Sequence, residues 1–390
     1  MSVLCITKGE LWLRDGAGAG QELHSPFARE VIERDERARR TTSWKHAPRE
    51  EQTGVIPTAS LWGQRGGAGA AMAPPRFLHA CRGDDGRTLY YVLGVGQSVG
   101  LFRHHLDEQR EVRLFHRNQL PCAGLAYNPQ DRRLIMANGH PDGTMHLEVY
   151  DEEGTLKGTV TDGDCMDSAP SMIPGQASAL VYASAGVARH PQSGQAVAVA
   201  HSAIHRLDYR KGDMAVLLED PAYDFIQPRM HPDGTLYAIR RPVEKPVGER
   251  ARSALEDAVL MPFRLIKAVF GYLNFFSMIY GKEPLRSAGG PRTPELDQDL
   301  GKLWLHGRLI ELGKVKTDPQ YAGNLVPRSW ELVRQPPGRG LQIVMPHVAA
   351  FDLAEDGSVL YTNGYELTAW RDGLKETLGR HELVEAIRAV

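Results

Sequence analysis

The chain has 390 residues, of which 24% are charged, and its formal net charge at pH 7 is -2. Phosphate binding requires a concentrated basic face, so we expect no nucleic-acid partner. The four cysteines form no Cys-x-x-Cys pair, and their scatter favours neither a zinc site nor a disulfide framework. Because the N-terminus shows no secretion signal, we expect a cytoplasmic protein.

The N-terminal part predicts one strand, one helix and one loop. Residues 3–13 alternate well enough for a strand, and residues 26–40 have the composition of a short helix. Residues 63–75 are dominated by glycine, alanine and proline, which predicts a loop.

From residue 77 onward, a turn phrase recurs between short strand-like runs. A polar pair followed by glycine supplies the left-handed residue of a tight hairpin, and the apolar residues after it begin the next strand. Clear copies are centred on Asp85-Gly86, Asp233-Gly234 and Asp356-Gly357. Recurrence at roughly 40 to 60 residues is typical of propeller blades, each of which is a four-stranded sheet made of two hairpins.

The sequence therefore predicts one all-β domain over residues 1–390, a six- or seven-bladed β-propeller of four-stranded blades. We place the blades at residues 77–117, 121–161, 180–219, 225–313 with an interruption, 320–345 and 346–378, and residues 1–62 complete the ring.

Three carboxylates lie close together in the sequence between two predicted blades. Asp162, Asp164 and Asp167 fall within six residues, and oxygen ligands at this density can hold Ca²⁺ or Mg²⁺. The stretch lacks the glycine and the distal glutamate of an EF-hand loop. We therefore favour a solvated turn and no cofactor, with a divalent cation at these residues as the alternative.

A segment with a helical pattern, residues 248–292, interrupts the blade at 225–313. At about 100° per residue, Arg264, Lys267 and Asn274 share one narrow face, and apolar side chains cover the rest. The pattern predicts an amphipathic helical insertion, and these polar residues argue against a membrane-spanning helix.

Such a helix can dock a protein partner, lie on a membrane surface, or pack on its own ring. Docking to a membrane would make the protein membrane-associated. The side chains that we expect at the contact are Phe263, Arg264, Lys267, Phe270, Phe275, Phe276 and Tyr280.

The two ends of the chain carry related phrases, Trp12-Leu13-Arg14-Asp15-Gly16 and Trp370-Arg371-Asp372-Gly373. Propellers commonly close the ring by pairing strands from both termini, because closure removes an exposed sheet edge. We expect such a closure here. The last segment, residues 379–390, has helical composition and predicts a C-terminal helix outside the ring.

The phrases at residues 225–237 and 167–172 resemble the repeat of TolB-like propellers, in which a proline precedes a Ser-Pro-Asp-Gly turn. This resemblance implies protein–protein interaction. Residues 124–129 look like a blade start of gluconolactonase-type propellers, which hydrolyse lactones with a divalent metal. Ala123 stands where that family usually has a metal-binding asparagine.

No enzymatic signature emerges from the motifs. The sequence has no His-Glu-x-x-His motif, we expect no Gly-x-Ser-x-Gly elbow, and the glycine sets at 16–20 and 94–100 lack a strand-to-helix context. We therefore interpret the protein as a non-enzymatic scaffold that docks a protein partner or a membrane surface through its helical insertion. The alternatives are a metal-dependent hydrolase and a small-molecule sensor, each with its site in the propeller channel.

Overall fold

Antiparallel hairpins dominate the fold. The computed structural model describes residues 2–16, 20–42, 74–96, 98–118, 120–189, 194, 196–243, 302–371 and 373–390. The predicted turns form as expected: Gly86, Gly234 and Gly357 have φ angles of 68°, 84° and 82°. In the second of these turns, the Asp233 carboxylate accepts a hydrogen bond of 2.7 Å from the Thr235 backbone amide. This contact satisfies a polar group at the point where the next strand begins.

Apart from one separate two-stranded hairpin, the described strands form six four-stranded units. The first contains β26 (Val384–Ala389), β1 (Ser2–Thr7), β2 (Glu10–Asp15) and β3 (Gln21–Leu23). The second contains β4 (Arg76–Arg82), β5 (Thr88–Val95), β6 (Ser98–His105) and β7 (Arg110–Asn118). The third contains β8 (Cys122–Asn128), β9 (Arg133–Gly139), β10 (Met145–Asp151) and β11 (Leu156–Thr159).

The fourth unit contains β12 (Cys165–Met172), β13 (Ala179–Arg189), β14 (Ala196–Asp208) and β15 (Asp213–Leu218). The fifth contains β16 (Tyr223–Met230), β17 (Leu236–Pro242), β20 (Glu331–Gln335) and β21 (Gln342–Pro346). The sixth contains β22 (Ala350–Leu353), β23 (Val359–Thr362), β24 (Glu366–Arg371) and β25 (Leu374–Arg380). One parallel pairing, between Met145 and Met166, joins the third unit to the fourth.

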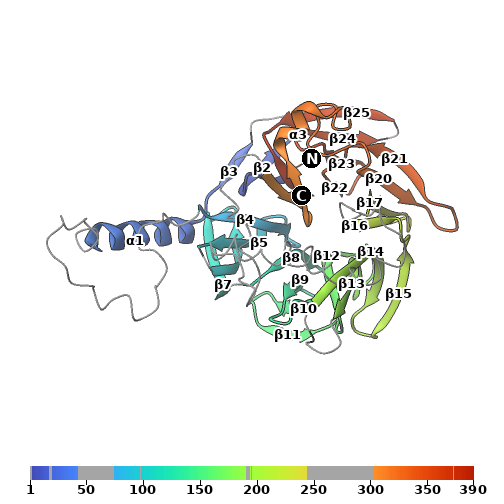
Figure 1. Ribbon diagram of the computed structural model, residues 1–390. Coiled ribbons are helices and arrows are strands. Elements are labelled where there is room, and N and C mark those ends of the chain that lie inside the picture. Colours follow the sequence, from blue (N-terminus) through green and yellow to red (C-terminus); the bar gives the residue numbers. More distant parts are fainter. Residues whose placement is uncertain are drawn as a thin grey trace, which may run out of the picture.

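The innermost strands of these units form a closed cycle. Strand β4 contacts β8, β8 contacts β12, β12 contacts β16, β16 contacts β22, β22 contacts β26, and β26 contacts β4. Figure 1 shows the units arranged around this centre. The predicted β-propeller architecture is therefore confirmed, and the described part of the chain holds six units in the cycle.

Close approach of the inner strands explains a glycine in β8. Gly124 has a φ of 157°, and a Cβ atom there would lie 2.5 Å from Cδ of Pro170 in β12. The pairing of β12 with β13 is irregular between Ser168 and Ser171, and Ala169 in that bulge has a φ of 50°. Proline tolerates a bulge because it has no backbone amide to donate to the ladder.

The ring closes through strands from both termini, as the related terminal phrases predict. Strand β1 pairs with β26, with Val3 opposite Ala389 and Cys5 opposite Ile387. The prediction of a C-terminal helix over 379–390 is wrong, because these residues contribute the end of β25 and the whole of β26. Hydrogen bonding to the free edge of β1, together with burial of Ile387, overrides the local helical composition.

Two of the predicted blade boundaries need correction. Residues 320–345 are not a separate blade, since β20 pairs with β17 and β21 pairs with β20, and the two strands complete the interrupted blade. The blade predicted at 180–219 begins earlier, at Cys165, because β12 forms its inner strand.

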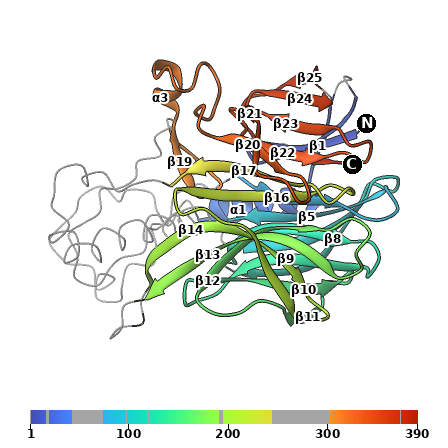
Figure 2. The same cartoon turned by 90° about the vertical axis from the view of Figure 1, so that its right-hand side faces the viewer.

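A hairpin and a short helix lie between β17 and β20 in the sequence. They are β18 (Lys302–Leu305), β19 (Arg308–Glu311) and α3 (Leu312–Thr317), and Figure 2 shows α3 projecting beyond the strands of the ring. Leu305, Ile310 and Val315 are buried in one core cluster with Trp330. The predicted helical insertion at 248–292 lies outside the described residues.

Apolar clusters fill the space between neighbouring units. Tyr90 of β5 stacks on Tyr127 of β8 with ring centroids 5.2 Å apart, within a buried cluster that spans the second and third units. Such inter-unit packing joins the sheets into one body, as expected for a propeller.

Helix α1 (Pro26–Thr42) confirms the helix predicted at 26–40. The Ser25 hydroxyl accepts a 3.1 Å hydrogen bond from the Ala28 amide, and Pro26 occupies the first helical position. Phe27 packs against Phe102 with ring centroids 5.2 Å apart, and the rest of the helix extends away from the ring (Figure 1). Within the described ranges, no helix combines the length and the apolar character needed to span a membrane.

Candidate metal centre

The three carboxylates predicted as metal ligands occupy different environments. Asp162 and Asp164 are exposed in the turn before β12, and the Asp164 carboxylate forms an ion pair with Arg189. Asp167 lies within β12 and is only 1% exposed. The structure therefore separates Asp167 from the other two carboxylates.

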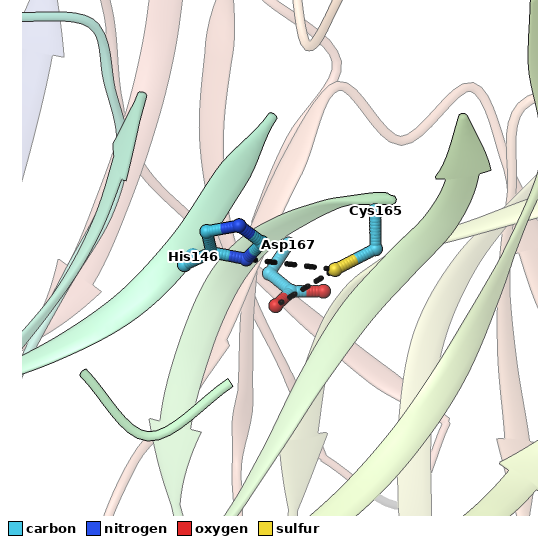
Figure 3. Close-up of side chains that lie close together, drawn as sticks. All are labelled: His146, Cys165 and Asp167. Atoms are coloured by element: carbon cyan, nitrogen blue, oxygen red, sulfur yellow. Dashed lines mark hydrogen bonds between the residues drawn. The ribbon is translucent and has the colours of Figure 1, made fainter. Parts of the chain in front are cut away.

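Instead, Asp167 lies beside a histidine and a cysteine. The candidate ligand atoms of His146, Cys165 and Asp167 all lie within 4.8 Å of one another (Figure 3). In the part of the chain that the structure describes, no other cluster of three or more such residues meets this distance.

The pairing of β10 with β12 brings these side chains together. Met145 pairs with Met166, so His146 follows the paired residue on one strand, while Cys165 and Asp167 flank it on the other. Because side chains alternate along a strand, Cys165 and Asp167 project to the same face. One parallel contact between two units thus places an imidazole, a thiol and a carboxylate on one side of the sheet.

The thiol lies between the other two groups. Cys165 Sγ is 3.7 Å from His146 Nδ1 and 3.6 Å from Asp167 Oδ2. Burial raises the pKa of the Cys165 thiol to about 12, and the negative charge of Asp167 acts in the same direction. Burial also raises the pKa of the Asp167 carboxyl above its usual value. Thiol and carboxyl are therefore both harder to ionise here than in water.

One oxygen of the carboxylate lacks an ordinary partner. Asp167 Oδ1 is buried and forms no hydrogen bond of normal geometry with the described residues. The hydroxyls of Ser184 and Thr161 lie close enough to lower the pKa of Asp167, against the larger effect of burial. Native proteins leave few buried polar atoms unsatisfied, because each one costs about 1–3 kcal/mol.

Further polar side chains surround the cluster of His146, Cys165 and Asp167. The His140 ring lies against the His146 ring with centroids 4.9 Å apart, and its Nε2 atom is 3.8 Å from Glu148 Oε1. Glu148 is buried and accepts a 2.8 Å hydrogen bond from Asn138. On the other side, burial lowers the pKa of His205 while the charge of Asp167 raises it. The cluster is thus part of a larger polar layer inside the ring.

Two further buried histidines form hydrogen bonds between separate parts of the propeller. His79 Nε2 lies 3.1 Å from the Cys122 carbonyl oxygen, and His306 Nε2 lies 2.9 Å from the Ala349 carbonyl oxygen. Burial lowers the pKa of His79 to about 4, and burial together with the nearby Arg241 charge lowers the pKa of His306 to about 3. Both rings are therefore neutral at pH 7 and donate hydrogen bonds to these carbonyl oxygens.

A cavity beside His79 is small. It is lined in part by Leu4, Ile6 and Arg388 and has a volume of about 10 Å³. That volume accommodates about one water molecule and no organic ligand.

The residues Gly96-Gln97-Ser98-Val99-Gly100 match the letters of a nucleophile elbow. Strand β5 ends at Val95 and strand β6 begins at Ser98, so the motif lies in a β-hairpin instead of the strand-to-helix turn that the elbow requires. The Ser98 hydroxyl donates a 2.9 Å hydrogen bond to Asn118 at the surface. This serine therefore has no catalytic context.

The residues predicted to contact a partner or a membrane, Phe263, Arg264, Lys267, Phe270, Phe275, Phe276 and Tyr280, lie outside the described residues. Sequence reasoning missed His146 and Cys165, because they are 19 residues apart and belong to different units. No short spacing motif marks such a pair. Only the register of β10 against β12 could have indicated it.

The sequence matches neither a model of a known protein family nor a curated protein. Among solved structures, TolB from Acinetobacter baumannii is similar with a TM-score of 0.51 and 10% identity, over 99% of this chain and 66% of that chain. A chain from a nidogen–laminin complex is similar with a TM-score of 0.51 and 8% identity, over 99% of this chain and 97% of that chain. The chain is thus a β-propeller, and its predicted resemblance to TolB-like propellers is confirmed for the fold.

Proposed function

We propose that this protein is a non-enzymatic interaction scaffold, in which the ring presents residues 248–292 to a protein partner. One observation carries this proposal: an arginine on each side of the insertion in the sequence pairs with the same carboxylate, that of Asp224. Asp224 of β16 forms an ion pair with Arg308, whose Nη2 atom lies 2.8 Å from Asp224 Oδ2. Arg241 Nε lies 3.4 Å from the same Oδ2 atom. Arg241 precedes the insertion in the sequence, and Arg308 follows it.

These contacts are well shielded from water. The side chains of Asp224, Arg241 and Arg308 are 15%, 8% and 10% exposed. The Arg241 guanidinium also lies over the ring of Trp330, 4.9 Å from its centroid. Because buried ion pairs are screened little by salt, this arrangement holds the two flanks firmly to the ring.

A rigid base is suited to recognition. Fixing the two ends of a contact segment reduces the entropy that is lost on binding. The wide apolar face predicted for residues 248–292 would supply burial area to a partner. The nidogen–laminin complex provides an example of a chain with this fold inside a protein complex, which supports the proposal by analogy alone.

The test compares three proteins in affinity capture from the native cell. They are the intact chain, a variant with residues 250–284 replaced by a Gly-Ser linker, and the control Leu374→Glu. Leu374 is 79% exposed on β25, so the control adds a charge to the ring without burying it.

We expect the intact chain and the control to retain the same protein in a fixed ratio, and the linker variant to lose it while unfolding at the same temperature. Equal retention by all three proteins would contradict the proposal. Flotation of only the intact protein with liposomes, without a captured protein, would assign the insertion to a membrane surface instead.

A further inference from the structure

We propose that His146, Cys165 and Asp167 form a Zn²⁺ site at the junction of the third and fourth units. The site is independent of the proposed docking function, because its residues lie on β10 and β12, within the ring itself.

The spacing of the ligand atoms fits tetrahedral zinc. With Zn–S and Zn–N bonds of about 2.3 and 2.0 Å, two ligand atoms at a tetrahedral angle are separated by about 3.5 Å. The observed separations from Cys165 Sγ are 3.7 Å to His146 Nδ1 and 3.6 Å to Asp167 Oδ2. One ion can span both distances, and the third pair of ligand atoms, from His146 and Asp167, lies within 4.8 Å.

A second observation concerns the buried carboxylate, which in the described part of the chain has only the hydroxyls of Ser184 and Thr161 and the Cys165 thiol beside it as donors. Asp167 is 1% exposed, yet its Oδ1 atom has no hydrogen-bond partner of normal geometry among the described residues. A cation bound at the carboxylate would offset the cost of burying it, since buried charges in proteins are paired or coordinate metals.

The donor set selects the type of metal. Ca²⁺ and Mg²⁺ prefer an all-oxygen shell, whereas a thiolate and an imidazole favour zinc over these hard cations. The proposed zinc site shares only Asp167 with the residues Asp162, Asp164 and Asp167, at which the sequence gives a divalent cation as the alternative to a solvated turn.

The site has three protein ligands. Zinc sites with three protein ligands keep a fourth position for water or another ligand. The His140 ring, 4.9 Å from that of His146, is close to this group without belonging to it. The three side chains form one group in the described part of the chain, so we expect one ion per chain.

The experiment uses the full chain, stripped with chelator and then titrated with Zn²⁺ and, separately, with Co²⁺. We expect one bound ion per chain. The Co²⁺ form should show thiolate-to-metal charge-transfer absorbance and the intense visible bands of a tetrahedral site.

Variants assign the ligands. Cys165→Ser should abolish the charge-transfer band, and Asp167→Asn should weaken Zn²⁺ binding at least about 100-fold, more than the usual effect of an outer-shell change. Asp164→Asn is the matched control, because this carboxylate is close in sequence and lies outside the cluster. It should bind Zn²⁺ like the parent chain.

Three outcomes would overturn the proposal. They are a parent chain that binds no Zn²⁺ at micromolar concentration, a Co²⁺ complex without the thiolate band, and equal loss of binding in Asp164→Asn and Asp167→Asn. Circular dichroism of each variant identifies any unfolded one. If Cys165→Ser does not fold, the Co²⁺ spectrum of the parent chain and the Asp167→Asn titration still decide the question.

Discussion

Asp224 and Arg308 are separated by 84 residues, yet their side chains meet at 2.8 Å inside the ring. The contact connects β16 to β19, the second described strand after the insertion. Arg308 also donates a hydrogen bond to the backbone carbonyl of Pro242, the last residue of β17. Pro242 and Arg308, which lie on either side of the insertion in the sequence, are therefore neighbours in the fold.

Removing the Asp224 charge should destabilise the fold. Asp224→Asn leaves Arg241 and Arg308 buried near a neutral group, and breaking a buried ion pair costs about 3–5 kcal/mol. Urea unfolding measures the loss. The control Glu30→Gln breaks an exposed pair with Arg34 on α1, with side chains 67% and 75% exposed, and should cost less than about 1 kcal/mol. Equal effects of the two substitutions would contradict the structural importance of Asp224.

A second buried pair should control the closure of the ring. Arg229 Nε lies 2.5 Å from Asp352 Oδ1, and Asp352 Oδ2 accepts a 2.9 Å hydrogen bond from the Ala389 amide. Asp352→Asn weakens the contacts of the fifth and sixth units with the C-terminal strand. We expect faster hydrogen exchange in residues 384–389, measured by mass spectrometry.

The matched control for ring closure is Glu382→Gln, which removes an exposed pair with Lys8 near the same strands. Exchange in residues 384–389 should stay close to that of the parent chain. If both variants exchange alike, Asp352 does not hold the closure.

Acidification should destabilise the protein through its buried histidines. The pKa values of His79 and His306 are about 4 and about 3, below the ordinary 6.5 of an unfolded chain. The unfolded state therefore binds more protons than the folded state below pH 6.5, so the free energy of unfolding falls as pH decreases from 6.5 toward 4 and is unaffected by these groups above about pH 7.5.

Urea unfolding at pH 7.5, 6 and 5 measures this dependence, in a range above the ordinary titration of carboxylates. His79→Asn should show a smaller loss between pH 7.5 and pH 5 than the parent chain. Constant or rising stability of the parent chain over that range would show that these histidines accept protons in the folded state.

A charge on the apolar face of the insertion should weaken partner binding. Burial of one phenylalanine contributes about 1.5–3 kcal/mol, so Phe270→Glu should raise the dissociation constant at least about tenfold. Calorimetry with the purified partner measures the change, and Leu374→Glu serves as the control for added charge on the ring. If Phe270→Glu alters neither binding nor stability, that face is not the contact.

Local signals made the blades predictable. Turns such as Asp233-Gly234 and Asp356-Gly357 need only a glycine in the left-handed conformation and a side chain that accepts a hydrogen bond from a backbone amide. Both residue types can be recognised in the sequence. The closure of the ring could be anticipated from the related terminal phrases. Its strand β26 could not, because residues 384–389 adopt an extended form only through pairing with β1.

The candidate metal centre was only partly predictable. Three aspartates within six residues suggested a polar turn, whereas Asp167 is buried in the inner strand β12 and only Asp162 and Asp164 are exposed. His146 joins it through the contact of Met145 with Met166, a relationship between units that no local pattern encodes. Non-local register thus determines the site, whereas local turn chemistry determines the blades.

Residues 250–284 are proposed to bind a protein partner from a rigid ring. The most direct test is the dissociation constant of the captured partner for the intact chain and for the Gly-Ser linker variant, measured by calorimetry at equal ionic strength. We expect binding at least about 100-fold weaker for the linker variant, with an unchanged unfolding temperature. Equal dissociation constants for the two proteins would contradict the account.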